Sequence, residues 1–163
     1  VPEIDVVDIV EVSRLFGGAE HRVCAVYARM LGDINGAVLF MLEREAALAL
    51  VDMMHGAEVG TAVAIGHDEE ALLRHVGSIL ISAYLAAIGR MAMLEVLPSS
   101  AALAYDMAGA LLESAVAEAG IEADSAFLVK ASFLDEGRRV DSVLFFVPQL
   151  ASLSVILGRL GMA

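Results

Sequence analysis

The sequence predicts an α/β domain in which helices pack over a central, mainly antiparallel sheet and two related halves give an approximate two-fold symmetry. Three observations predict this fold. Strand-like and helix-like segments alternate along the chain, no Pro-rich or low-complexity linker interrupts them, and the chain resembles itself when it is shifted by 105 positions. We therefore expect a single domain over residues 1–163, with a first half at 1–66 and a second half at 67–163.

The internal similarity is the strongest of these observations. At the shift of 105 positions, Gly32, Val38, Leu39, Phe40, Ala46, Leu48 and Gly56 fall on Gly137, Val143, Leu144, Phe145, Ala151, Leu153 and Gly161. A solenoid needs at least three short repeats, so two long copies predict a pseudo-symmetric fold instead. The second copy has a long helix and a strand before its hairpin. We expect a corresponding helix before Val1.

The first half reads as a helix, a hairpin and a second helix. Residues 8–16 are a short helix, because Asp8 can cap its start and Gly17 can stop it. The following segments are a strand at 22–31, a glycine-bracketed turn at 32–36, a strand at 37–42 that is apolar on both faces, a helix at 44–55 and a loop at 57–66. The apolar strand should be central and covered by helices on both sides.

The second half starts with the longest helical pattern of the chain. Acidic residues at 68–70 favour a helix start, and apolar residues follow a helical period to about Ile88. The next segments are a strand at 92–97, a helix at 106–119, a hairpin with strands at 126–134 and 139–147, and a final helix at 149–160.

Composition excludes several classes of protein. Hydrophobic residues make up 59% and mean hydropathy is +0.76, but the uncharged run 76–89 is shorter than the roughly 20 residues of a membrane span. We therefore expect a buried core helix and no membrane contact. The net charge of −12 disfavours nucleic acid as a partner. The single cysteine, Cys24, forms no internal disulfide, which is consistent with a cytoplasmic protein.

Four segments resemble the CheC family of chemotaxis phosphatases. They are the turn Gly32-Asp33-Ile34-Asn35-Gly36 with its apolar strand, the stretch from Leu72 through Pro98, the run Asp106-Met107-Ala108-Gly109-Ala110, and the segment from Val147 to Gly161. They follow the family's order along nearly the whole chain. The resemblance implies the pseudo-two-fold CheC-like fold, which CheX and the middle domains of FliM and FliY share.

The resemblance also implies a substrate and a mechanism. The substrate would be a CheY-type response regulator phosphorylated on an aspartate, which brings its own Mg²⁺ and Lys, so the protein needs no cofactor of its own. In the family, an Asn carboxamide orients the attacking water and a Glu pairs with the regulator's Lys. Both come from one helix as Ser/Asp-x-x-x-Glu-x-x-Asn, and these spacings place the three side chains on one helix face.

This sequence departs from that motif at every position. Alignment on Gly77-x-Ile79 puts Ala71 at the Ser/Asp position, His75 at the Glu position and Ser78 at the Asn position. His75 has no carboxylate to attract a Lys, and a serine hydroxyl lacks the reach and the fixed plane of an amide. We therefore expect no intact catalytic motif in this chain, and the corresponding helix of the first copy would lie before Val1.

Two other readings of these residues are weaker. His75 and Ser78 stand at i and i+3 and could form a nucleophile pair, but no acidic residue stands at a spacing that would orient the histidine. The four histidines are scattered without the spacing of metal ligands, so we expect no metal site.

Three functions remain open at this stage. The first is a CheC-like protein that acts on phosphorylated CheY-type regulators. The second is a non-catalytic interaction module that binds a receiver domain, the receptor deamidase CheD or the flagellar switch. The small residues of the 106–119 helix are a candidate CheD contact: Ala108, Gly109, Ala110, Ala115, Ala117 and Ala119. The third is a small-molecule site lined by Met53, Met54, Met91 and Met93. A homodimer is compatible with each.

Overall fold

The computed structural model describes residues 4–118 and 125–161. Its strands are β1 (Ile4–Asp8), β2 (Arg22–Gly32), β3 (Gly36–Glu43), β4 (Val96–Pro98), β5 (Ala102–Met107), β6 (Ser125–Asp135) and β7 (Arg138–Pro148). Its helices are α1 (Ile9–Val12), the 3-10 turn η1 (Ser13–Phe16), α2 (Arg44–His55), α3 (His67–Ala92), α4 (Ala108–Glu118) and α5 (Leu150–Arg159). The expected α/β class with a central antiparallel sheet is confirmed.

One seven-stranded sheet forms the centre of the molecule, in the order β1-β6-β7-β3-β2-β4, with β5 also pairing β2. Every ladder among these strands is antiparallel. The segments 36–43 and 138–148 lie side by side at its middle. The 37–42 strand is therefore central, as expected from its two apolar faces.

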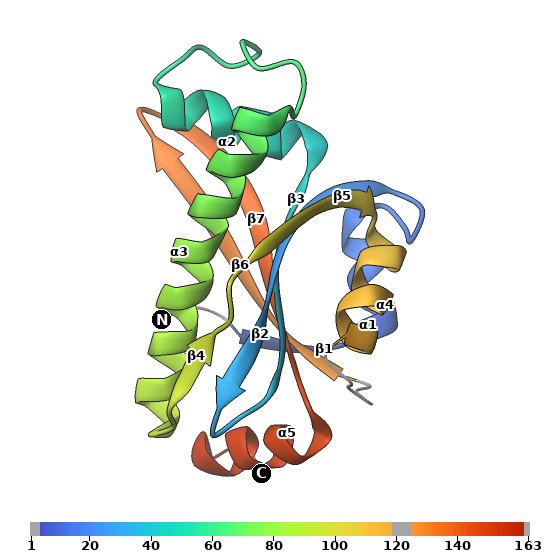
Figure 1. The fold of residues 1–163 in the computed structure, drawn as a ribbon, viewed down its shortest axis with the longest axis vertical. Helices are drawn as coiled ribbons and strands as arrows, with labels where there is room; N and C mark the ends of the chain where they lie inside the picture. Colours follow the sequence, from blue (N-terminus) through green and yellow to red (C-terminus); the bar gives the residue numbers. More distant parts are fainter. Residues whose placement is uncertain (1–3, 119–124, 162–163) are drawn as a thin grey trace.

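Two layers of helices cover the sheet. On one face, α2 and α3 pack over one part of the core and α5 closes its end; on the other face lie α1, η1 and α4 (Figure 1). The first core contains Val38, Phe40, Leu50, Ile81 and Ile156. The second contains Phe16, Leu39, Met41, Leu112 and Phe145.

The two halves of the chain interleave within the sheet. The element order β1-α1-β2-β3-α2 recurs as β5-α4-β6-β7-α5. Each half lends its first strand to the other half, since β1 pairs β6 and β5 pairs β2. The β3–β7 ladder, with Leu39 opposite Phe145, lies between them. The recurring order is compatible with two related halves, and the division at 1–66 and 67–163 stays a prediction.

The register of the central β3–β7 ladder relates the two halves by a shift of 106 positions, and not by the 105 positions of the sequence comparison. Directly opposite residues share a face of the sheet, and Leu39 faces Phe145 while Phe40 faces Leu144. A shift of 105 would move Phe40 onto Phe145, which lies in the other core. A shift of 106 keeps each side chain on its own face. It also aligns the N-cap residues Glu43 and Gln149, whose φ, ψ angles are −62°, 154° and −59°, 152°.

The glycine-bracketed turn at 32–36 is hydrogen-bonded to the segment after α3 and to α5. The Asp33 amide donates to the Glu95 carbonyl at 2.9 Å, and the Asp33 carboxylate accepts from the Glu95 amide at 2.7 Å. On its other side, the Asn35 amide donates to the Ser152 hydroxyl at 3.0 Å. Gly32, at φ 121°, lies against the Glu95 carbonyl so closely that a Cβ would collide with it. The turn therefore ties the end of α3 and the start of α5 to the central hairpin.

Several element boundaries differ from the sequence prediction. Strands β1 and β5 were not predicted. The predicted strand at 92–97 is reduced to Val96–Pro98, because α3 continues to Ala92. The helix predicted at 106–119 starts at Ala108. Residue 119 lies outside the described residues.

Candidate functional site on the long helix

The helix α3 is a long platform fixed to the sheet along one side. Its buried residues recur at every fourth position, at Leu73, Gly77, Ile81, Leu85 and Gly89. This spacing places them in one stripe. At its start, Glu69 accepts a hydrogen bond from the Gly66 amide at 3.0 Å, and three acidic residues occupy the first turn, where they complement the helix dipole.

Two glycines of the buried stripe let the helix approach its neighbours. A Cβ on Gly77 would lie 2.7–2.8 Å from three side-chain atoms of Val26 on β2. A Cβ on Gly89 would lie 2.7 Å from the Leu94 carbonyl, where the chain turns back toward β4. The opposite side of α3 is consequently held at a fixed height above the sheet and faces solvent.

The three predicted site positions lie on the solvent side of α3. Ala71 and His75 are exposed and Ser78 is half-buried. Their spacing of four and three residues puts them in a row on one helix face. None of the three supplies a carboxylate or an amide. The structure thus brings the positions together without the groups that the family motif requires.

Ser78 and His75 do not form the hydrogen bond of a nucleophile pair. The Ser78 hydroxyl donates to the Arg74 carbonyl, one turn back, at 2.8 Å. Its proton is therefore engaged by the helix's own backbone. No group of three His, Cys, Asp or Glu side chains that could hold a metal ion occurs within residues 4–118 and 125–161.

The solvent side of α3 is also rich in apolar and small residues. Ile79 is 57% exposed, and Ala83 and Ala86 are exposed as well. By length and composition α3 could cross a membrane. The expected buried core helix is only partly correct, because 22% of its apolar window is buried and the helix packs on the sheet along one stripe. Contiguous exposed apolar surface of this kind is often where a partner binds.

The methionines do not form one pocket. Met53 is buried in the first core, Met54 is exposed at the end of α2, and Met91 and Met93 are exposed at the far end of α3. A cavity of about 500 Å³ lies elsewhere, between η1, α2 and the β6–β7 hairpin, and no methionine lines it. These four methionines therefore do not form the small-molecule site that the sequence left open as a third function.

The small residues of α4 are divided between the core and the surface. Ala108 and Ala115 are buried in the second core, and the Gly109 amide donates to the Ala19 carbonyl at 2.9 Å. Ala110 is half-buried and Ala117 is exposed. Ala108 and Ala115, two of the five described residues of the face proposed for CheD, thus lie in the core, and the last of its residues, Ala119, is not described.

Comparison with known proteins identifies the relatives of this fold. The chain is 26% identical over 165 residues to the CheY-P phosphatase CheC of Bacillus subtilis (strain 168), with 99% of this chain and 79% of the relative covered. The chain resembles CheC. This likeness along nearly the whole sequence confirms the expected resemblance, whereas no protein-family model matches the chain.

Solved structures confirm the fold class of this CheC-like chain. Thermotoga maritima FliY superposes with a TM-score of 0.70 at 9% identity, covering 99% of this chain and 80% of FliY. A chain of the FliG–FliM complex from H. pylori gives a TM-score of 0.60 at 13% identity, covering 96% and 79%. At such low identity these likenesses show the fold alone.

Proposed function

We propose that this protein is a CheC-like chemotaxis signalling protein that acts on phosphorylated CheY-type response regulators and binds them with the solvent side of α3. One observation carries the proposal: Ala71, His75 and Ser78 stand in a row on the exposed face of a firmly packed helix. The similar protein CheC, whose name is CheY-P phosphatase, supports the substrate class.

The side chains on this face favour binding over hydrolysis. Phosphoryl transfer depends on a group that positions the attacking water and on charges that stabilise the transferring phosphoryl group. Ala71 has no functional group, His75 has no carboxylate, and the Ser78 hydroxyl already donates to Arg74. The regulator would supply Mg²⁺ and Lys, but α3 adds no amide to orient water.

The test restores the missing groups on the same helix. A CheY-type receiver is phosphorylated with acetyl phosphate, and the half-life of its phosphoaspartate is measured with and without the protein. The wild-type chain is expected to leave the half-life unchanged. The double variant His75→Glu with Ser78→Asn is expected to shorten the half-life about tenfold or more. A carboxylate or amide that positions the reacting groups contributes at least this much to the rate.

A matched control carries the same side chains one turn further along α3. The variant Ile79→Glu with Ser82→Asn keeps the spacing of three residues but leaves the aligned motif positions unchanged, and it should have no effect on the half-life. Accelerated decay with the wild-type chain would show that His75 and Ser78 are active as they stand. Equal effects of both double variants would contradict the proposed position of the site.

A second candidate is a non-catalytic interaction module for a receiver, CheD or the flagellar switch. The replacement of the motif's Glu and Asn by His75 and Ser78 favours it. Ala110 and Ala117 are the remaining accessible small residues of the proposed CheD face. Pull-down of CheD that is unaffected by Ala117→Arg would count against this contact. For both candidate functions we propose a cytoplasmic protein that needs no cofactor of its own. Both functions are compatible with a homodimer.

A further inference from the structure

The loop between α2 and α3 is held by a buried carboxylate. Asp52 on α2 is only 2% exposed. Its Oδ2 atom accepts hydrogen bonds from the amides of Gly60 at 2.8 Å and Thr61 at 3.1 Å, and its Oδ1 atom accepts from the amide of Ala62 at 2.7 Å. Charge-assisted bonds of this kind are stronger than those between neutral groups. The middle of the loop is therefore fixed to α2.

Three more side chains hold the rest of the loop. Arg138 of β7 donates to the Ala57 carbonyl at 2.6 Å, and Arg44 of α2 donates to the Val63 carbonyl at 2.8 Å. The bond from the Gly66 amide to Glu69 fixes the last loop residue to α3. Side chains from two helices and a strand thus hold the backbone at each part of residues 57–66.

This fixed loop exposes apolar side chains. Val59 is 65% exposed and Val63 is 74% exposed. The loop thus combines two exposed valines with four side chains that anchor its backbone. A loop that binds a partner gains from both, because fixing its backbone in advance removes the ordering cost at binding.

The position of the loop connects it with the face of α3. The loop runs over the end of the molecule and enters the first turn of α3 (Figure 1). At 1.5 Å per residue, His75 lies about 12 Å along the helix from its start. A standard interface buries about 800 Å² on each partner and spans roughly 30 Å. A partner of this size centred on His75 and Ser78 would extend past the first turn of α3, where the loop ends.

We propose that residues 57–66 form a second contact surface for the CheY-type receiver, with Val59 and Val63 covered by an apolar patch of the receiver. This inference rests on the proposed function and adds a specificity-determining element outside the motif helix. The anchors Asp52, Arg44 and Arg138 act as positioning residues, since they touch the loop backbone and leave the valines to face the partner.

The test measures binding by isothermal titration to each CheY-type receiver of the source organism, trapped with beryllofluoride. Val59→Glu and Val63→Glu should each weaken binding at least tenfold, and Val63→Ile should bind as the wild type does. Val10→Glu is the matched control, because Val10 is 70% exposed on α1, on the other side of the sheet. It should stay within twofold of the wild type.

The anchoring role is read separately by hydrogen exchange. Asp52→Asn should speed exchange at the amides of Gly60 and Thr61 and weaken receiver binding severalfold, at a temperature where the far-ultraviolet circular dichroism is unchanged. If the wild-type chain binds the receiver and Val59→Glu and Val63→Glu bind it equally well, this inference is overturned and the proposed function stands. No binding by the wild-type chain overturns both.

Discussion

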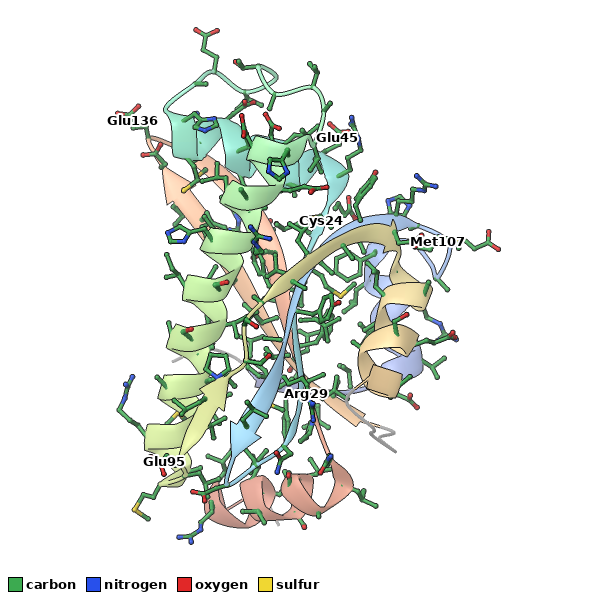
Figure 2. All side chains as sticks on the ribbon, in the orientation of Figure 1. Cys24, Arg29, Glu45, Glu95, Met107 and Glu136 are labelled. Atoms are coloured by element: carbon green, nitrogen blue, oxygen red, sulfur yellow. The ribbon has the colours of Figure 1, made fainter. Side chains whose placement is uncertain are left out.

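At the scale of single residues, Cys24 shows how burial changes the chemistry of a side chain. Cys24 lies on β2 under α3 and is 1% exposed (Figure 2). Burial, with a smaller contribution from the charge of Glu70, raises the pKa of the thiol from 9.0 to about 12. The reactive thiolate is therefore scarce in the folded protein near neutral pH.

This pKa predicts a loss of stability at alkaline pH. Below pH 9 the thiol keeps its proton in both the folded and the unfolded protein, so its contribution to the free energy of unfolding is complete. This contribution falls as the pH rises from 9 toward 12. Between pH 8 and pH 10, the free energy of unfolding of the wild type should fall by about 1 kcal/mol more than that of Cys24→Ala. Urea unfolding at both pH values measures this difference; parallel pH curves would contradict it.

The sequence identified the row of site residues but not the anchors of the neighbouring loop. The spacing of Ala71, His75 and Ser78 is enough to place them on one helix face. Asp52 carries a weaker signal: it is an acidic residue inside the apolar run Leu48–Met54 of α2, where burial requires a partner. Its partners are backbone amides in a loop, and no sequence pattern reveals those.

At the scale of elements, Gly77 shows the fit between α3 and the sheet. Alanine favours a helix over glycine by about 1 kcal/mol, but at position 77 the added Cβ would collide with Val26. We expect Gly77→Ala to lower the free energy of unfolding by about 1–3 kcal/mol. The control is Gly158→Ala in α5, where a Cβ meets nothing within 4 Å and should add up to 1 kcal/mol.

Urea unfolding of both glycine variants measures the comparison. The addition of Val26→Ala to Gly77→Ala should make the loss smaller than the sum of the two single changes, because the shortened side chain makes room for the Cβ. A Gly77→Ala variant as stable as Gly158→Ala would show that α3 does not pack as closely as the structure indicates.

The helices and long strands could be predicted from the sequence, whereas the short edge strands could not. The β2–β3 and β6–β7 hairpins and the helices α2 and α5 have a clear period and clear turn residues. The β5 strand, ALAYDM, is rich in alanine and has low intrinsic strand preference. It forms because it pairs with the long β2 strand. The end of α3 was placed too early, because Met93 stops the helix at φ 54° without a glycine or proline.

At the scale of the whole molecule, the interleaved sheet decides what can fold alone. Strand β1 pairs only with β6 among the described ladders, and β5 pairs with β2. We expect separate fragments 1–66 and 67–163 to lack a cooperative unfolding transition and to regain one when mixed. Circular dichroism during thermal unfolding measures this. A fragment with a dispersed amide NMR spectrum on its own would contradict the expectation.

The same interleaving sets the order of events on the ribosome. Domains generally fold as units while synthesis proceeds from the N-terminus. Here β1 is synthesised first but finds its neighbour β6 only after residues 125–135 have left the exit tunnel. Until β7 has been synthesised, the edge of β3 that will pair with it stays without a neighbouring strand. The unpaired edge of β3 is therefore open to pairing with another chain until β7 is made.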